Sequence, residues 1–247
     1  MDNLIYYILS ALAVLIILTV HEYSHGYAAY KLGDNTARNL GRLSLNPIKH
    51  LDPAGAICMI LFHFGWAKPV PINPRNFKNP KRDFAITALA GPLSNILLAF
   101  FSAFFYLLLQ ALFRGVSFES EFLYSLASNA LLFVYLFHAI NVGIGIFNLI
   151  PIPPLDGSRI LNAVLPPRIY FGIMKYEQRI YWALVCWLIF GTYVARALLS
   201  IPIIANSAVL SFIAGLFSLS DILSTVFDAV SRLMMNFWRL IPFLNPR

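Results

Sequence analysis

Long apolar blocks alternate with short polar and basic stretches along the chain. Four of these blocks are long enough to cross the hydrocarbon core of a bilayer, which takes about 20 residues of helix. They cover residues 4–29, 84–113, 122–150 and 180–199. A fifth apolar run, residues 54–64, is too short to span and lies between two basic loops, so we predict that it is re-entrant.

The end of the chain carries a different pattern. Residues 201–219 are uncharged and are compatible with a return across the membrane. From Ser218 onward, polar residues recur at three- and four-residue steps, namely Ser218, Asp221, Thr225, Asp228, Arg232 and Arg239. This is one polar stripe on an apolar helix, suited to lying in the membrane interface or to packing on another helix. We predict a core at residues 1–200 and a tail at residues 201–247, in the same domain or on the membrane surface.

Composition makes a membrane protein the expected class. Hydrophobic residues make up 59% and charged residues only 12% of the 247 residues, and the mean hydropathy is +0.72. Soluble domains contain about 25% charged residues. We predict an all-α polytopic membrane protein, a helical bundle of about four to six membrane segments, with a small re-entrant or β element between the first two full spans.

The formal net charge of +7 is interpreted as topology, because basic residues collect in cytoplasmic loops. Residues 31–83 contain 9 Lys and Arg, residues 157–179 contain 4, and loop 114–121 contains 1. This pattern places the two basic loops in the cytoplasm and the N-terminus outside, in the cell (inner) membrane. No basic stripe stands clear of the apolar blocks, so no nucleic-acid partner is expected. The first block lacks a basic leader and a cleavage site, which indicates a retained span rather than a signal peptide.

Three ionisable residues lie in the second half of the first span. His21-Glu22-Tyr23-Ser24-His25 matches the pattern H-E-x-x-H. On a helix, residues i and i+4 project from one face, so both imidazoles can bind one metal ion and the glutamate can activate a metal-bound water. Ionisable groups inside a membrane are rare and functional by default, which favours this interpretation over a hydrogen-bonded core histidine.

A catalytic zinc ion needs a third protein ligand, and few acidic residues lie at the right depth. Glu119 and Glu121 are in the loop on the opposite side of the membrane, and Glu177 is in a basic loop without a Glu-x-x-x-Asp pattern. Asp156 follows prolines that interrupt a span, on the same side as the H-E-x-x-H pattern. Because backbone freed within a membrane must line a cavity, this position favours Asp156 as the candidate third ligand over an ordinary turn.

Together these motifs resemble the site-2 protease family of intramembrane zinc metalloproteases. The resemblance rests on H-E-x-x-H, on Gly91-Pro92-Leu93-Ser94-Asn95 and on Asn148-Leu-Ile-Pro-Ile-Pro-Pro-Leu-Asp-Gly157. It covers about residues 15–165. The stretch Gly41-Arg42-Leu43-Ser44-Leu45-Asn46-Pro47 with His50, Asp52 and Pro53 is typical of compact prokaryotic members. The chain leaves no room for the PDZ or CBS domain of larger members.

The resemblance implies a zinc metalloendopeptidase with one Zn²⁺ per chain. By motif position, its metal ligands are His21, His25 and Asp156. Glu22 is then the general base and acid that activates a zinc-bound water. Asn95 and Asn148 match polar residues near the metal and are candidates to hold the substrate backbone or the developing oxyanion; for Asn95 an interhelical hydrogen bond is the alternative. Gly91 would allow close helix packing.

A substrate helix must be unwound before hydrolysis, and its freed backbone groups then need new partners. Residues 66–73, with alternating prolines, are a candidate edge strand that presents the substrate through Trp66, Val70 and Ile72; a polyproline-II connector is the alternative. A membrane-associated β-sheet in this region of the family favours the edge. The expected partners are the lipid bilayer and membrane-anchored proteins cut in regulated intramembrane proteolysis, such as anti-sigma factors or signal-peptide remnants. Self-association into a homo-oligomer stays open.

Three other functions fit the sequence less well. Another class of membrane zinc protease needs a Glu-x-x-x-Asp on a later helix, which the chain lacks. A metal transporter needs metal ligands along several spans, and apart from His138 the other spans hold almost none. For His138, a hydrogen bond to another helix or to a metal-binding residue is favoured over direct metal binding. A catalytically silent relative need not keep the four motif residues. His63 lines a route into the site or faces the membrane interface.

Overall fold

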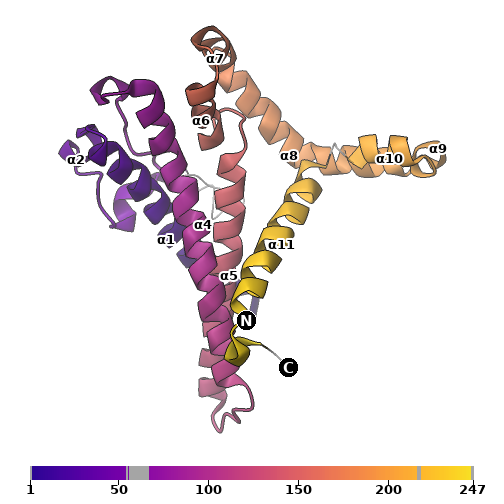
Figure 1. Ribbon diagram of the computed structural model, residues 1–247. Helices are drawn as coiled ribbons and strands as arrows, with labels where there is room; N and C mark the ends of the chain where they lie inside the picture. The colour runs from indigo at the N-terminus through magenta and orange to yellow at the C-terminus, as the bar shows by residue number, and fades with distance from the viewer. Residues whose placement is uncertain (1, 54, 56–66, 216–217, 246–247) are drawn as a thin grey trace.

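The computed structural model describes residues 2–53, 55, 67–215 and 218–245 (Figure 1). The longer helices are α1 (Asp2–Lys31), α4 (Pro80–Phe113), α5 (Glu121–Leu149), α8 (Glu177–Leu199) and α11 (Leu219–Trp238). The shorter helices are α2 (Thr36–Asn39), α6 (Asp156–Val164), α7 (Pro167–Met174), α9 (Pro202–Ala205) and α10 (Ala208–Gly215), with 3₁₀ turns at Pro47–His50, Pro74–Asn76 and Pro242–Leu244. No strand is formed within the described ranges, and the predicted all-α membrane fold is confirmed.

Four of the described helices, α1, α4, α5 and α8, are long and apolar enough to cross a membrane. They coincide with the four predicted apolar blocks. Figure 1 shows α2, α6, α7 and the start of α4 towards one end of the bundle and the connection between α4 and α5 at the other end. The basic loops that the charge pattern assigns to the cytoplasm therefore share one end, while their cytoplasmic location stays a prediction.

Helix α4 is the centre of the bundle and contacts α1, α5, α6 and α11. Its outward face carries large apolar side chains at four-residue steps, each about half exposed: Leu93, Leu97, Phe101 and Phe105. Many of the buried positions of the same helix are small, among them Ala88, Gly91, Ala99 and Ala103. Lipid supplies no hydrophobic force between helices, so membrane helices associate through small residues that let their backbones approach closely. The pattern of α4 is that of a membrane helix with one face packed against other helices and the other face towards lipid.

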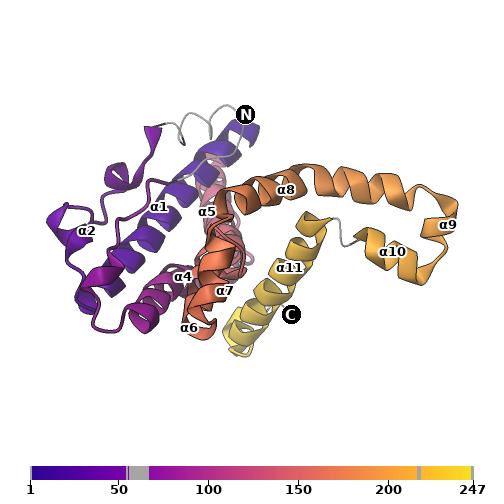
Figure 2. The same ribbon diagram turned by 90° about the horizontal axis from the view of Figure 1, so that it is seen from above.

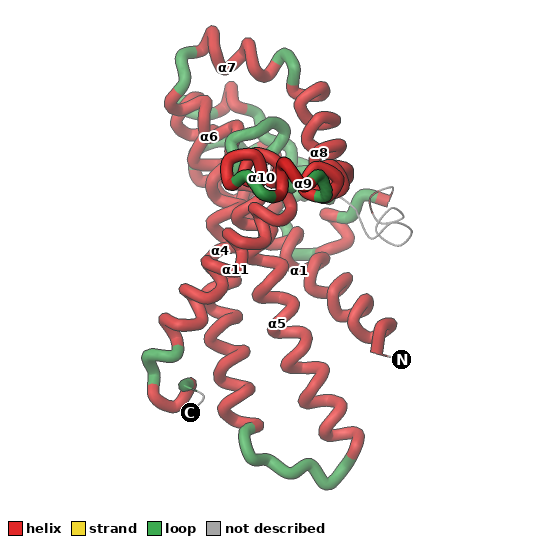
Figure 3. Tube along the Cα trace, turned by 90° about the vertical axis from the view of Figure 1, so that its right-hand side faces the viewer, coloured by secondary structure: helices red, strands yellow, loops and turns green. Residues whose placement is uncertain are grey.

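The last helix packs against the bundle with its apolar face. Figure 3 shows α11 alongside α4 and α5, where Met234 and Met235 are buried. Two hydrogen bonds of 2.8 Å join these helices: Trp238 Nε1–H donates to the Phe100 carbonyl, and His138 Nε2 pairs with Ser231 Oγ. The latter is the interhelical bond that the sequence favours for this histidine. Residues 201–215 form the two short helices α9 and α10, and the division into core and tail stays a prediction.

Helix α8 leaves the bundle. Figure 2 shows it running from α7 away from α1, α4 and α5 towards α9 and α10. Within the described residues its main contacts are with α9, α10 and α11. The large side chains of Trp182, Phe190 and Tyr193 on α8 are between 57% and 68% exposed. A helix with so much apolar surface outside the bundle needs lipid around it.

The connection between α1 and α4 is fastened to the end of α1 by Asp34. This carboxylate is fully buried and accepts hydrogen bonds from the Thr36 N–H and hydroxyl, from the Asn73 N–H at 2.7 Å and from the Asn76 side-chain amide at 2.7 Å. Burial alone would raise the pKa of Asp34, but these hydrogen bonds outweigh burial and hold the pKa below its usual value. Residues 73–76 are therefore fixed relative to α1.

Apart from residue 55, the predicted re-entrant run 54–64, which includes His63, lies outside the described residues, as does the candidate edge residue Trp66. Residues 67–73 are described and form no strand. One isolated antiparallel bridge pairs Leu51 with Ala67, and the Lys68 N–H donates to the His50 carbonyl at 2.9 Å in this part of the structure. The β element between the first two spans stays a prediction.

Candidate metal centre

Helix α1 carries the H-E-x-x-H pattern in its last three turns. His21 and His25 lie one turn apart on the face that packs against α4, and both are at most 6% exposed. Their Nε2 atoms are 3.0 Å apart. Glu22 is half-buried on the same helix. The spacing of the motif therefore brings both imidazoles to one place, as the helical period requires.

Hydrogen bonds from α4 fix the orientation of both rings. His21 Nδ1 lies 2.7 Å from the side-chain oxygen of Asn95, and His25 Nδ1 lies 2.7 Å from the Thr87 carbonyl oxygen. Both partners are acceptors, so each Nδ1 donates its proton and each Nε2 keeps a lone pair. Asn95 is fully buried and donates from its amide to Asn141 Oδ1 on α5 at 3.2 Å. Helices α4 and α5 thus hold two electron-pair donors of α1 towards one point.

Asp156 brings a third donor from much further along the chain. It is the first residue of α6, and its Oδ2 lies 3.2 Å from Nε2 of both His21 and His25. Two nitrogen lone pairs and a carboxylate oxygen this close repel one another unless a cation lies among them. Tetrahedral ligands about 2.0–2.1 Å from a zinc ion are roughly 3.3 Å apart. The observed separations of 3.0, 3.2 and 3.2 Å therefore fit one zinc ion.

Two glycines leave the space that this arrangement needs. A Cβ atom at Gly91 would lie 2.3 Å from His25 Nε2 and 2.8 Å from His21 Cε1. A Cβ atom at Gly157 would lie 2.3 Å from the Leu149 carbonyl oxygen, because the turn before α6 folds back onto the end of α5. Real Cβ atoms essentially never come within 3.0 Å of such neighbours, so a side chain at either position would force the structure to shift. The close helix packing expected at Gly91 thus takes place directly against the two histidines.

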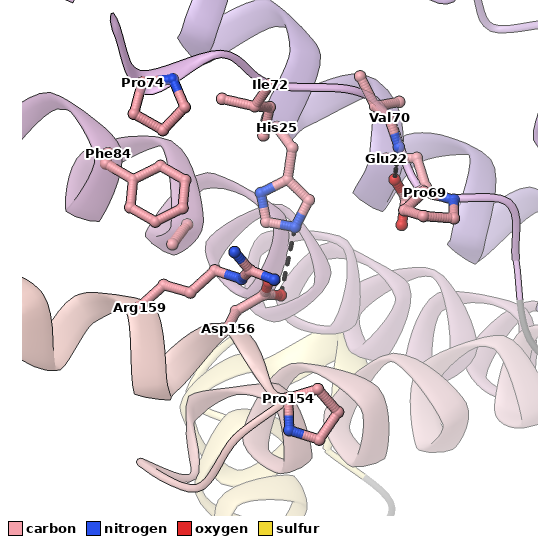
Figure 4. Close-up of a pocket in the computed structure, with 11 residues that line it drawn as sticks. Glu22, His25, Pro69, Val70, Ile72, Pro74, Phe84, Pro154, Asp156 and Arg159 are labelled. Carbon is pink, nitrogen blue, oxygen red and sulfur yellow. Dashed lines mark hydrogen bonds and ion pairs between the residues drawn. The ribbon is translucent and has the colours of Figure 1, made fainter. Parts of the chain in front are cut away.

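A cavity of about 420 Å³ lies beside the three donors. Figure 4 shows Glu22, His25, Asp156 and Arg159 around it. The rest of its lining is mostly apolar, including Pro69, Val70, Ile72, Pro74, Phe84 and Ala88. Glu22 accepts a hydrogen bond from the Val70 N–H at 2.7 Å. A carboxylate, two of the donors and an apolar wall therefore meet at one cavity.

The predicted site residues divide into two groups. Those brought together around the cavity and the donors are His21, Glu22, His25, Asp156, Val70 and Ile72. Asn95 contacts His21 behind the donors, and the amide of Asn148 donates to the Ile144 carbonyl of its own helix at 3.0 Å. The oxyanion role of these two asparagines stays a prediction.

The sequence interpretation missed three residues. Asn141 is fully buried in α5, and a polar side chain inside an apolar span is a signal that could have found it. Arg159 lines the cavity, and its guanidinium lies 5.5 Å from the centre of the Phe84 ring. Its position one helical turn after Asp156 could have indicated that it lies near the site. Asp34, which follows the first span directly, fastens the loop that forms the cavity wall.

A sequence model of Peptidase family M50 matches residues 9–190. The chain belongs to this family. Among M50-type relatives, "Putative zinc metalloprotease YwhC" of Bacillus subtilis (strain 168) is 40% identical over 183 residues, which cover 72% of this chain and 81% of that protein. "Putative zinc metalloprotease Rip2" of Mycolicibacterium smegmatis is 28% identical over 165 residues, which cover 65% of this chain and 59% of that protein. No solved structure matches the chain.

Membership in M50 gives the general activity of the protein. It is a multi-pass membrane zinc metalloprotease, and the resemblance to the site-2 protease family is confirmed. The matched region begins within α1 and ends within α8, so it contains the three donors, Glu22 and Gly91. The tail helices α9 to α11 lie beyond it.

Proposed function

We propose that this M50 protease hydrolyses peptide bonds in or near transmembrane segments of membrane-anchored proteins. His21, His25 and Asp156 hold the zinc ion, and Glu22 is the general base and acid. The observation that carries the proposal is the convergence of three donor atoms within 3.2 Å of one another, beside a cavity that Glu22 also lines.

The residues divide the reaction between them. Bound zinc supplies a Lewis acid that polarises the scissile carbonyl and lowers the pKa of water to about 7. Glu22 accepts the proton that the attacking water loses as its oxygen bonds to the carbonyl carbon. The same carboxyl group then donates this proton to the amide nitrogen as the C–N bond breaks, which leaves a carboxyl group and an amine. Asn95 and the Thr87 carbonyl keep the Nδ1 protons of the histidines engaged, so that their Nε2 atoms stay available.

We expect residues 67–73 to present the substrate. Val70 and Ile72 line the cavity, and Pro69 and Pro71 have no N–H, which limits pairing to part of the segment. An unwound substrate alongside it would recover part of the backbone hydrogen bonds that its helix has lost. The apolar wall that includes Phe84 favours an apolar substrate side chain next to the scissile bond.

We place the active site near the cytoplasmic side of the cell membrane, with the N-terminus outside. Support comes from the 9 and 4 basic residues in the loops at the end of the bundle where α6 begins, against 1 in the loop at the other end. Candidate substrates are anti-sigma factors and signal-peptide remnants, which carry one membrane segment and become accessible at this side.

The test compares three purified proteins in detergent: the wild type, Glu22→Ala, and Glu119→Ala as a matched acidic control in the opposite loop. Each is incubated with an unfolded reporter protein and with a single-span reporter, and zinc per chain is measured by mass spectrometry. We expect cleavage by the wild type and by Glu119→Ala, no cleavage by Glu22→Ala, and zinc in all three.

Two further variants test the ligand set. His25→Ala and Asp156→Ala are expected to lose both zinc and cleavage, because two remaining donors do not hold the ion tightly. Cleavage by Glu22→Ala at the wild-type rate would refute the assignment of the base. Full zinc content in Asp156→Ala would refute the assignment of the third ligand.

A further inference from the structure

The one hydrogen bond that Glu22 makes within the described residues comes from a main-chain group. Its Oε2 accepts from the Val70 N–H at 2.7 Å. Val70 stands between Pro69 and Pro71, so its N–H is the only one that residues 69–71 possess. Val70 is 6% exposed, so its N–H has little access to water as an alternative partner. A buried N–H and a carboxylate at this distance form a strong, charge-assisted hydrogen bond.

The segment that carries this N–H is fastened on both sides of Val70. Before it, the Lys68 N–H donates to the His50 carbonyl at 2.9 Å, and the Arg42 guanidinium donates to the Lys68 carbonyl at 2.7 Å. After it, the Asn73 N–H donates to Asp34 at 2.7 Å. The main chain at Val70 is therefore held in place independently of Glu22.

The side chain of Val70 sets the distance to α1. Its Cγ1 lies 3.1 Å from the point where a Cβ atom at Gly26 would stand, one turn after Glu22. A larger residue at position 26 would push the segment away from the helix. Glycine lets the segment lie directly on α1, within reach of the carboxylate.

On the basis of the proposed function, we propose that the Val70 N–H is a positioning group for Glu22. It fixes one carboxylate oxygen against the wall of the cavity and leaves the other oxygen free for the attacking water. Glu22 is a flexible side chain on a helix surface, and a base that occupies several rotamers is correctly placed only part of the time. The hydrogen bond positions Glu22 for the chemical step and does not contact the substrate. Its loss therefore lowers kcat and leaves KM unchanged.

The experiment removes this single N–H. Valine 70 is replaced by its α-hydroxy acid through suppression in cell-free synthesis with lipid nanodiscs, which exchanges the amide N–H for an ester oxygen and keeps the side chain. The same exchange at Lys68 is the matched control, because it removes the neighbouring bond to the His50 carbonyl without touching Glu22. Zinc content, kcat and KM are measured for each protein, together with the wild type and Glu22→Ala.

The ester at Val70 is expected to lower kcat about tenfold to a hundredfold, with KM within about threefold of the wild type and zinc content unchanged. The ester at Lys68 should lower kcat much less than the ester at Val70 does, because it leaves the Val70 N–H bonded to Glu22. An ester at Val70 with raised KM and wild-type kcat would overturn the inference, because the N–H would then bind substrate and not Glu22. Equal losses of kcat at Val70 and Lys68 would also overturn it, since general loosening of the segment would explain them. Cleavage by Glu22→Ala at the wild-type rate would overturn the proposed function and this inference with it.

Discussion

A single methyl group at position 91 should abolish the metal centre. In Gly91→Ala the new Cβ atom would lie 2.3 Å from His25 Nε2, which is about 1.2 Å closer than the roughly 3.5 Å of an unstrained contact. His25 cannot turn away, because its Nδ1 is bonded to the Thr87 carbonyl of the same helix α4. The ring or the helix must therefore move by about 1 Å, whereas zinc sites tolerate deviations of about 0.2 Å.

The expected loss follows from these distances. Changes to groups behind a metal ligand weaken zinc binding about 10–100-fold, and a displaced ligand should weaken it by more than about 100-fold. The rate of cleavage should fall by at least about 100-fold, because a 1 Å displacement of a group in the active site is enough for a loss of this size. The cost in folding free energy should stay at about 1–3 kcal/mol, partly offset by about 1 kcal/mol from the better helix propensity of alanine. Zinc per chain, cleavage of the single-span reporter and thermal unfolding in detergent measure the three quantities.

Gly143→Ala is the matched control. Gly143 also lies inside a membrane helix, α5, and its Cβ atom would meet Phe227 at an ordinary 3.8 Å. We expect wild-type zinc content and cleavage from this variant. Wild-type zinc content in Gly91→Ala would refute the reasoning, because it would mean that His25 Nε2, the atom next to position 91, does not bind the ion.

Three further predictions concern the residues around the site. Asn95→Ala should weaken zinc binding about 10–100-fold by releasing the His21 ring, measured by competition with a chelator; unchanged affinity would contradict this. Asp34→Asn should lower the unfolding temperature most between about pH 5 and 8. Because the pKa of Asp34 is lower in the folded protein, its contribution to stability is complete above the unfolded-state pKa of about 3.9. This contribution is lost as the pH falls through the lower pKa of the folded state. A difference in unfolding temperature between wild type and variant that grows towards pH 3 would contradict the assignment. His138→Ala should leave Ser231 without its partner on α5 and loosen α11 from the bundle. Limited proteolysis should then cut the tail earlier than the core. Equal rates of cleavage in tail and core would exclude a role of His138 in holding α11.

The membrane spans could be predicted closely because hydropathy alone selects them. The bilayer requires about 20 apolar residues in each span, and that requirement is visible in one dimension. The path of α8 could not be predicted in the same way, since its sequence resembles that of a helix inside a bundle. Residues 201–215 carry no charge, and the polar pair Asn206-Ser207 between α9 and α10 is the one sign of a break in this apolar stretch.

The candidate site was predictable where the chemistry belongs to residue types at fixed spacing. The structure brings His21, His25 and Asp156 together, as helical period and depth in the membrane predict, and their role as ligands stays a prediction. The use of Asn95 could not be decided, because sequence gives the depth of a residue but not the partner on its face. In the structure, Thr87, Gly91 and Asn95 follow one another at four-residue steps along α4 and all face the histidines. The Val70 N–H left no trace in the sequence, since every residue except proline has a main-chain N–H.

The distance in sequence between the donors on α1 and α6 sets the order in which the centre can be assembled during synthesis. Asp156 is translated 131 residues after His25. At a synthesis rate of about 5–20 residues per second, this interval lasts roughly 7–26 s. During that time the chain holds His21 and His25 but not yet Asp156. With the proposed ligand set, the three donors cannot come together until α6 has been made.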